Sequence, residues 1–395
     1  MSKLPDRAYR LEQLPPYGFA VIGQRIQEMT AAGKDIIRLD IGSPDLPPPA
    51  HVVDSLVNSA RNPGNYQYGS YRGDPGFRRA VAGYYERRFG VALHPDREVL
   101  PLIGSKEGIV NLALAYLDRG DAAIVPSLHY PAYMMGTLLA GAEVIELPLD
   151  PATGYLPIYS AIKGDLSRAK LLWINYPNNP TGAVADLDAY AEAVEFCKQH
   201  NLLLCSDNPY CDVGFDGYVA PSVLQVPGAM DCAVEFISLS KTYNLAGWRI
   251  GACVGNREAL DALLTIKSNI DSGHWKSIYD GAATALNTTP QSWIDERNAH
   301  YQARRDRILA TLPEIGLEAF KSSASLYVWA KVRDEYLSHN YCEHALNNAL
   351  VALTPGDMYG NDGVGYVRIS LGVADDRLDE ALNRLREWYK MKVAL

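Results

Sequence analysis

Residues 238–251 read Ser-Leu-Ser-Lys-Thr-Tyr-Asn-Leu-Ala-Gly-Trp-Arg-Ile-Gly and directly follow the apolar segment Val234–Ile237. The stretch places one lysine, Lys241, among hydroxyls, an arginine and glycines at the end of an expected strand. A lysine amine forms a Schiff base only when its positive charge is partly suppressed, and cationic or desolvating surroundings achieve this. Arg249 and the two serines offer contacts for a phosphate. The stretch therefore predicts a site for a phosphorylated aldehyde, although an isolated match would more often be a surface lysine beside a turn.

Two further polar segments follow apolar runs in the same way. Asn175–Gly182 comes after Leu171–Ile174, and Ser206–Tyr210 comes after Leu202–Cys205. Both apolar runs are typical of buried strands. Polar residues just past the ends of successive parallel strands form the ligand site of open α/β sheets. We therefore expect these segments and Lys241 to meet at one edge of a sheet.

The central two-thirds of the chain alternates strand-like runs with helical patterns. This alternation requires crossover connections and predicts a mainly parallel sheet. The expected strands are Ala122–Pro126, Glu143–Leu147, Lys170–Ile174, Leu202–Ser206, Glu235–Ser238 and Gly251–Gly255, and the expected helices are Glu107–Leu117, Met134–Gly141, Asp186–His200 and Arg257–Ser268.

The C-terminal part has a different pattern. Gln291–Leu312 is a long polar helical segment that leads away from the predicted core. After it, Leu326–Val332 and Gly365–Ser370 are expected strands, and Asn340–Leu350 and Arg377–Met391 are expected helices. This mixture predicts a smaller C-terminal domain of α+β type.

Composition limits the class of protein. The 395 residues are 48% hydrophobic and 21% charged, which is ordinary for a globular chain of this length. A formal net charge of −9 argues against a nucleic-acid surface, and no apolar run approaches the roughly 20 residues that cross a bilayer. We therefore expect a cytoplasmic protein with no nucleic-acid or membrane partner. The six cysteines lack zinc-like spacing, so we expect thiols and no metal site: Cys197, Cys205, Cys211, Cys232, Cys253 and Cys342.

From about Leu14 to the C-terminus, these ordered motifs resemble the pyridoxal 5'-phosphate-dependent aminotransferases of the aspartate aminotransferase superfamily. This resemblance implies fold type I, an α/β fold whose large domain has a mainly parallel seven-stranded sheet flanked by helices, with a smaller α+β domain. Within the superfamily the chain is most similar to the LL-diaminopimelate aminotransferases. The motifs of that group are Leu14–Tyr17, Ile41–Pro47, Leu102–Ile109, Asn175–Ala185 and Lys267–Gly273.

The resemblance also implies a domain division. Residues 1–45 would form an N-terminal segment that packs with the small domain, through a helix at Gly18–Ala32. Residues 46–289 would form the large cofactor-binding domain, and residues 290–395 the small C-terminal domain.

Transamination needs an electron sink, a base and clamps for two anions. Lys241 would hold the cofactor as a Schiff base and then act as the general base for the proton shift. Asp207 would pair with the pyridine nitrogen and keep it protonated. Asn179 and Tyr210 fall where the family places hydrogen-bond donors to the ring oxygen, and Tyr130 matches the aromatic residue that stacks on the ring. Each of these residues also has a plain structural role, such as a turn or a packing contact.

The expected phosphate site combines Ser105 and Lys106, at a helix start, with Ser238 and Arg249. A helix N-terminus presents unpaired N–H groups, and an arginine adds a bidentate fork. Tyr68 matches a family tyrosine that reaches the phosphate from the neighbouring subunit. The resemblance therefore implies a homodimer with shared active sites.

Arg368 lies within an apolar strand and would clamp the substrate α-carboxylate, with a structural ion pair as the alternative. Gly42 would let the backbone approach the substrate, and Tyr17 would form part of a lid. The distal part of the substrate is expected to meet Tyr17, Tyr71, Lys106 and Asn269 of the partner subunit. The substrate-binding set is Arg368, Gly42, Tyr17, Tyr71, Asn179 and Asn269.

The resemblance implies transfer of an amino group from an amino acid to a 2-oxo acid such as 2-oxoglutarate, with LL-diaminopimelate as the donor in lysine biosynthesis. A strict dicarboxylate enzyme would usually place an arginine near Leu264–Asn269, where this chain has Lys267. Departures at Asp40, His274-Trp275 and Asp357–Tyr359 leave other donors open, namely aspartate, alanine, methionine or an aromatic amino acid. Lyases and decarboxylases of the same fold also stay open.

Overall fold

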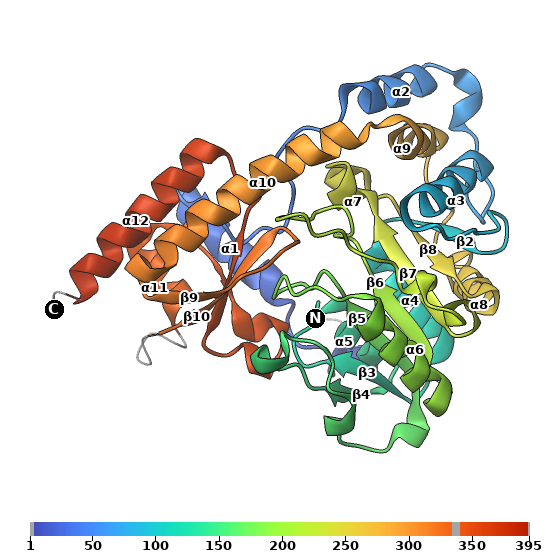
Figure 1. The fold of residues 1–395 in the computed structure, drawn as a ribbon, viewed down its shortest axis with the longest axis horizontal. Helices are drawn as coiled ribbons and strands as arrows, with labels where there is room; N and C mark the ends of the chain where they lie inside the picture. Colours follow the sequence, from blue (N-terminus) through green and yellow to red (C-terminus); the bar gives the residue numbers. More distant parts are fainter. Residues whose placement is uncertain (1–3, 334–339, 394–395) are drawn as a thin grey trace.

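A seven-stranded sheet forms the centre of the larger body of the chain in the computed structural model, which describes residues 4–333 and 340–393 (Figure 1). Its strand order is β2-β8-β7-β6-β5-β3-β4. Strands β3 to β7 pair in parallel, whereas β8 runs antiparallel to β2 and β7. The expected mainly parallel seven-stranded sheet is therefore confirmed. The strands are β2 (Val99–Leu102), β3 (Ala122–Pro126), β4 (Glu143–Leu147), β5 (Ala169–Asn175), β6 (Leu203–Asp207), β7 (Ala233–Ser238) and β8 (Gly251–Gly255).

Helices cover both faces of this sheet, so the central strands are apolar on both sides. Alternate residues of β5 show the consequence: Leu171 and Trp173 pack on one face, and Leu172 and Ile174 pack on the other. The helices of the larger body are α2 (Ala50–Ala60), α3 (Pro75–Phe89), α4 (Ser105–Tyr116), α5 (Ala132–Leu139), α6 (Leu187–His200), α7 (Leu239–Thr242), α8 (Arg257–Lys267) and α9 (Lys276–Thr288).

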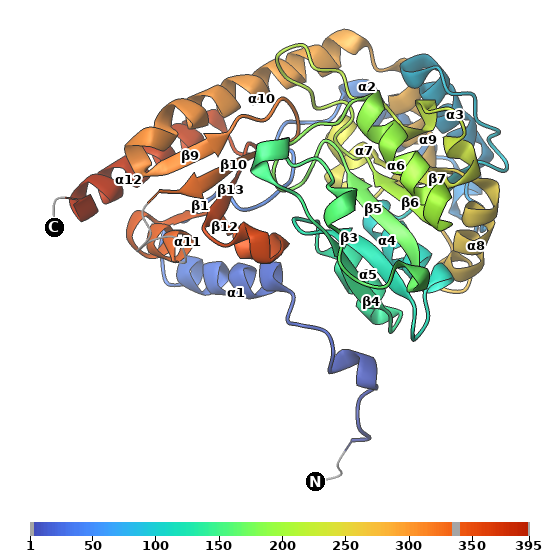
Figure 2. The same ribbon diagram turned by 60° about the horizontal axis from the view of Figure 1, so that its bottom comes forward.

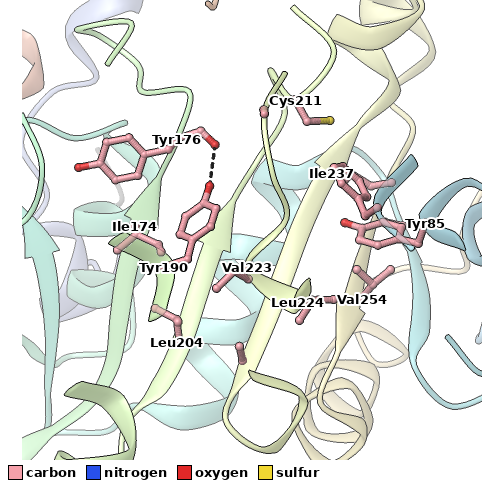
Figure 3. Close-up of a cluster of buried hydrophobic side chains, with 14 of the residues drawn as sticks. Tyr85, Ile174, Tyr176, Tyr190, Leu204, Cys211, Val223, Leu224, Ile237 and Val254 are labelled. Carbon is pink, nitrogen blue, oxygen red and sulfur yellow. Dashed lines mark hydrogen bonds between the residues drawn. The ribbon is translucent and has the colours of Figure 1, made fainter. Parts of the chain in front are cut away.

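The core on one face of the sheet combines strand residues with residues of loops and of flanking helices (Figure 3). Tyr85 of α3 and Tyr190 of α6 are buried against side chains such as Leu204 and Ile237. The Tyr190 hydroxyl donates a 3.2 Å hydrogen bond to the carbonyl of Tyr176 (Figure 3). These tyrosines bury large apolar rings while their hydroxyls keep polar partners.

A smaller body contains a four-stranded antiparallel sheet in the order β12-β13-β10-β9. The long helix α10 (Gln291–Thr311) runs from the larger body to the smaller one (Figure 1). The expected α+β second part is confirmed. Its elements are β9 (Leu317–Phe320), β10 (Tyr327–Val332), α11 (Tyr341–His344), β11 (Val351–Ala352), β12 (Thr354–Pro355), β13 (Tyr366–Ser370) and α12 (Asp375–Val393).

The N-terminal part lies with the smaller body. Helix α1 (Gly18–Ala31) packs there through Ile26, and the segment before it extends away from the rest of the chain (Figure 2). Strand β1 (Ile37–Arg38) pairs in parallel with β11. The expected helix over 340–350 is instead the short α11 followed by a π-helical turn, Ala345–Ala349. The domain boundaries at 45 and 289 stay a prediction.

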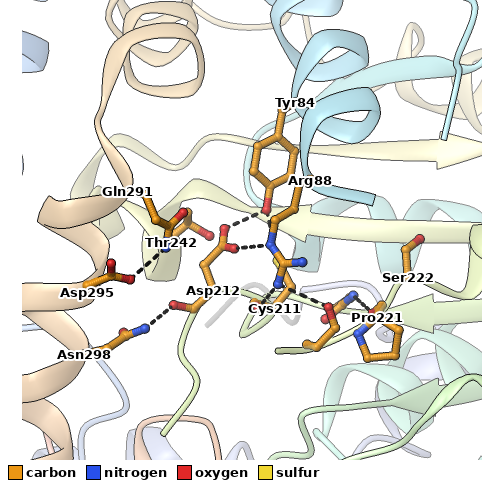
Figure 4. Close-up of polar contacts among 12 residues, drawn as sticks. Tyr84, Arg88, Cys211, Asp212, Pro221, Ser222, Thr242, Gln291, Asp295 and Asn298 are labelled. Atoms are coloured by element: carbon orange, nitrogen blue, oxygen red, sulfur yellow. Dashed lines mark hydrogen bonds and ion pairs between the residues drawn. The ribbon is translucent and has the colours of Figure 1, made fainter. Parts of the chain in front are cut away.

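Asp212 joins the loop after β6 to helices of both bodies (Figure 4). Its carboxylate accepts hydrogen bonds from the Tyr84 hydroxyl at 2.6 Å and from Nε of Arg88 at 3.0 Å, both on α3. Its carbonyl accepts from the amide of Asn298 on α10 at 2.9 Å. The loop that carries Tyr210 is therefore held from two sides.

The described residues contain no helix that is both long and apolar enough to cross a membrane. All six cysteines are unpaired, and four of them are buried. Within residues 4–333 and 340–393, no three histidine, cysteine or acidic side chains gather in a way that would hold a metal ion.

Candidate active site

A cavity of about 530 Å³ opens beyond the carboxyl ends of β5, β6 and β7. Residues from the N-terminal segment and from both sheets line it, as expected for a site at the C-terminal edge of an α/β sheet. The structure brings twelve of the predicted site residues together in this lining: Tyr17, Gly42, Ser105, Lys106, Tyr130, Asn179, Asp207, Tyr210, Ser238, Lys241, Arg249 and Arg368.

Three predicted site residues lie outside the cavity lining. Tyr68 is 92% exposed and Tyr71 is 58% exposed. Asn269 is also exposed, and its side-chain amide donates to the carbonyl of Thr265 at 2.8 Å. Tyr68 and Asn269 were expected to serve the site of a second subunit. Tyr71 was expected in its own site, and the single chain does not place it there.

Lys241 lies on the short helix α7, directly after β7, and its Nζ donates to the carbonyl of Gly42. A side chain at position 42 would overlap Tyr327, because a Cβ there would lie 2.1 Å from the Tyr327 hydroxyl oxygen. Burial lowers the pKa of Lys241, and the positive charges of Arg368 and Arg249 add to this, while Tyr327 acts in the opposite direction. The site therefore favours a neutral, nucleophilic amine.

Asp207 ends β6 and is 3% exposed. Its Oδ2 accepts a 2.6 Å hydrogen bond from the Tyr133 hydroxyl, and its carbonyl accepts from the amide of Asn175 at 2.6 Å. Its Oδ1 is buried and has no hydrogen-bond partner among the described residues. Burial raises the pKa of Asp207 to about 7, although the bond from Tyr133 lowers it. The free oxygen can receive a donor from a bound ligand.

An anion site lies where α4 begins. Gly104 precedes the helix with φ 74°, and a Cβ there would lie 2.5 Å from Nη2 of Arg249. Glycine is required both for this backbone conformation and for the close approach of the guanidinium. Ser105 and Ser238 line the same part of the cavity. The helix N-terminus, two hydroxyls and a guanidinium together can hold a phosphate group.

Arg368, on β13, is 2% exposed. Its Nη1 donates to Oδ1 of Asn179 at 2.9 Å, and its Nη2 donates to the carbonyl of Asp40 at 2.8 Å. The carboxylate of Asp40 pairs with Arg38 at 2.7 Å, so it leaves Arg368 without an acidic side-chain partner among the described residues. Nε of Arg368 is buried and unpaired within the described chain. This guanidinium can clamp a carboxylate.

Tyr17 and Lys106 line another part of the cavity. Nζ of Lys106 lies 4.4 Å from the centre of the Tyr17 ring and 3.3 Å from its hydroxyl. Tyr130 lies edge-on to Tyr133, with ring centres 6.0 Å apart. Its ring lines the cavity and can pack against a flat ligand.

Lys267 does not line the cavity. It is 2% exposed, and its Nζ lies 3.2 Å from Glu107 and 2.8 Å from Asp271. Both of these contacts are ion pairs. The lysine that occupies the expected arginine position is therefore engaged inside the protein and is not free to bind a distal carboxylate.

Two tyrosines at the site were not expected from the sequence. Tyr327 lines the cavity, and Tyr133 contacts Asp207 behind it. Tyr133 follows Tyr130 by three residues, so a helical spacing would have placed both on one face. Tyr327 stands in an apolar strand segment, where a tyrosine is typical of packing, and no sequence signal distinguishes it.

Comparisons of this chain with known protein families, sequences and structures identify its family. Residues 34–385 match the family described as aminotransferase class I and II. The chain is 49% identical to an LL-diaminopimelate aminotransferase of Dehalococcoides mccartyi over 95% of this chain and 97% of that protein. The solved structure of apo-BacF from Bacillus subtilis has a TM-score of 0.93 and 35% identity, and covers 97% of this chain and 98% of its own. An aminotransferase structure from Staphylococcus aureus has a TM-score of 0.89 and 31% identity, over 97% and 99% of the two chains. This chain therefore belongs to the class I and II aminotransferase family and is an aminotransferase.

Proposed function

We propose that the chain binds pyridoxal 5'-phosphate in the cavity and transfers the amino group of LL-diaminopimelate to 2-oxoglutarate. The observation that carries this proposal is that Lys241, Asp207 and Arg368 line one cavity. The buried atoms fit the cofactor, because Oδ1 of Asp207 and Oγ of Ser240 lack partners within the described residues. When bound, the cofactor supplies a sink for the electrons released at the substrate α-carbon.

The polar residues of the cavity supply the proton chemistry. Lys241 would hold the cofactor through its amine and would move a proton at the substrate α-carbon, for which its lowered pKa is suited. Asp207 would hold the ring nitrogen of the cofactor in its protonated form through Oδ1. Tyr210 and Asn179 would donate to the ring oxygen of the cofactor, and Tyr130 would pack on its ring.

The anion sites orient the two partners of the reaction. Ser105, Ser238 and Arg249 bind the phosphate at the start of α4. Arg368 clamps the substrate α-carboxylate, and the absence of a side chain at Gly42 leaves room beside it. A substrate fixed at both ends presents its α-carbon to Lys241 in one orientation, which lowers the entropic part of the barrier.

The donor is inferred from the relative in Dehalococcoides mccartyi, whose name states LL-diaminopimelate. Two features of the chain support this inference. Lys267 is paired with Glu107 and Asp271, so it offers no free cation for the side-chain carboxylate of aspartate. Tyr17 and Lys106 offer a polar surface that suits a distal amino-acid group.

We also propose a cytoplasmic homodimer with shared active sites. Tyr68 and Asn269 are exposed in the single chain and lie outside its own cavity. A second subunit would supply its own Tyr68 to the phosphate and its own Asn269 to the distal end of the substrate.

A screen of amino donors tests the proposed function. Purified protein is loaded with pyridoxal 5'-phosphate and given 2-oxoglutarate with LL-diaminopimelate, aspartate, alanine, methionine or phenylalanine, and glutamate formation is measured. We expect the highest kcat/KM with LL-diaminopimelate and no turnover in Lys241→Ala. The matched control is Lys170→Ala, because Lys170 is exposed, pairs with Asp121 and does not line the described cavity. A preference for another donor would overturn the substrate, and turnover without 2-oxo acid would indicate a lyase or decarboxylase.

A further inference from the structure

Tyr327 connects the two sheets at the cavity. It begins β10 of the smaller body and is 2% exposed, yet its side chain lines the cavity of the larger body. It contacts three residues to which the proposed function gives separate tasks, namely Tyr210, Arg368 and Gly42.

The Tyr327 hydroxyl forms a 2.8 Å hydrogen bond with the Tyr210 hydroxyl. The same hydroxyl lies 3.5 Å from the carbonyl of Gly42, which also accepts from Nζ of Lys241. The phenol therefore lies beside both the residue expected to donate to the ring oxygen and the reactive amine. Either hydroxyl can donate in this bond, and the direction that leaves the proton of Tyr210 free for a ligand is the one in which Tyr327 donates.

The Tyr327 ring supports Arg368. The guanidinium carbon lies 3.9 Å from the ring centre, which is closer than its approach to Tyr359 at 5.0 Å or to Phe19 at 5.9 Å. Stacking of a guanidinium on an aromatic face is favourable, and it keeps the guanidinium parallel to the ring. The ring thus fixes the direction in which Arg368 presents its donors.

We propose that Tyr327 is a positioning residue with two separable functions: its ring orients Arg368 for the substrate α-carboxylate, and its hydroxyl orients Tyr210 toward the cofactor. This inference rests on the proposed function, since it assigns Tyr327 to the same site. Tyr327 would thereby couple Arg368, which is on the smaller body, to Tyr210, which is on the larger body.

Two substitutions separate the functions. Tyr327→Phe keeps the ring and removes the hydroxyl, so we expect kcat to fall about threefold to tenfold, the size of one lost buried hydrogen bond, with KM within about twofold of wild type. Tyr327→Leu removes the ring as well, so we expect KM for both the amino donor and 2-oxoglutarate to rise roughly tenfold, in addition to the fall in kcat.

A binding measurement checks the ring without turnover. 2-Oxoglutarate added to enzyme loaded with pyridoxal 5'-phosphate has no amino group to receive, so its dissociation constant can be measured by calorimetry. We expect this constant to rise roughly tenfold in Tyr327→Leu and to change less than about twofold in Tyr327→Phe. In an Arg368→Lys background, Tyr327→Leu should raise the dissociation constant of 2-oxoglutarate by less than about threefold. Lysine lacks the planar guanidinium that the ring supports.

The control is Tyr341, another buried tyrosine of the smaller body, whose hydroxyl donates to the carbonyl of Ile315 at 2.8 Å, away from the cavity. Tyr341→Phe and Tyr341→Leu should lower the melting temperature but leave kcat, KM and the dissociation constant near wild type. The inference would be overturned if Tyr327→Phe and Tyr327→Leu changed the dissociation constant of 2-oxoglutarate equally. It would also be overturned if Tyr327→Leu raised this constant as much in the Arg368→Lys background as in the wild type. Absence of amino transfer in the wild type would instead overturn the proposed function.

Discussion

The hydroxyl of Tyr133 donates a 2.6 Å hydrogen bond to Oδ2 of the buried Asp207, while Oδ1 of the same carboxylate has no partner among the described residues. Tyr133 is itself held by Trp173, with parallel rings whose centres lie 4.9 Å apart. The carboxylate plane is therefore fixed by a rigid neighbour. One oxygen is used by the protein and the other is left for a ligand.

Asp207→Asn should abolish most turnover while the cofactor still binds. The amide has nearly the shape of the carboxylate but no negative charge, so it cannot keep the ring nitrogen protonated. We expect kcat to fall by roughly a hundredfold to a thousandfold, the size of the effect of one major electrostatic contact in an active site. Cofactor content measured by absorbance after gel filtration should remain substantial. Near-normal kcat at saturating cofactor would contradict the assigned role.

The contribution of Asp207 to the stability of the cofactor-free protein should fall between about pH 4 and about pH 7. Burial raises the pKa of Asp207 to about 7, whereas an aspartate in the unfolded chain titrates near 3.9. Because the folded state holds this proton to higher pH, its contribution to stability is fully present at low pH and is lost as the pH rises through about 7.

Urea unfolding of the wild type and of Asp207→Asn across this range isolates the contribution, because the other titrating groups are common to both proteins. The free energy of unfolding of the wild type should decrease relative to that of Asp207→Asn as the pH rises. In Tyr133→Phe the loss should extend to higher pH, since the hydrogen bond from Tyr133 lowers the pKa of Asp207. Parallel pH curves for the wild type and Asp207→Asn would exclude this titration.

Arg297→Met should strongly destabilise the protein. Arg297 lies on α10, is 3% exposed, and donates to the carbonyls of Lys241, Thr242 and Asp212. Its loss leaves buried carbonyls without this partner, so we expect the free energy of unfolding to fall by about 2 to 4 kcal/mol. Urea unfolding measures the change.

The control is Arg307→Met on the same helix. Arg307 is partly exposed and pairs with Asp375 and Asp379, so its loss should cost less than about 1 kcal/mol. Because Arg297 holds the backbone of Lys241, its substitution should also reduce kcat. An Arg297→Met protein as stable as the Arg307→Met protein would show that the three carbonyls find other partners.

Hybrid dimers should recover activity from two inactive variants. Lys241→Ala lacks the reactive amine, and Tyr68→Phe lacks the hydroxyl expected to reach the phosphate of the partner subunit. A hybrid of the two contains one site with both groups intact, so free exchange of subunits at equal amounts should restore about a quarter of wild-type activity. Activity is measured before and after mixing, with subunit exchange followed by native mass spectrometry. Full activity of a monomer at high dilution would exclude shared sites.

Much of the fold and the chemical centre could be predicted from the sequence because the signals are local. Apolar runs that alternate with helical patterns indicate a parallel sheet wherever they occur, and β3, β4 and β8 have the predicted bounds. Lys241 and Asp207 could be identified because Asp207 ends a buried strand and Lys241 stands shortly after another. β2 was not singled out by the apolar runs, although the resemblance implied seven strands.

Tertiary structure alone decided how side chains distant in the sequence meet. Arg368 and Asn179 are 189 residues apart, and their hydrogen bond depends on the packing of β13 against the loop after β5. The same holds for Tyr327 with Tyr210, and for Lys267 with Glu107. From residue type alone, each of these side chains could pack in the core, lie charged on the surface or contribute to a binding site. Periodicity reports which face of an element is buried, but the partner across the interface depends on how the elements pack, and only the folded chain determines that.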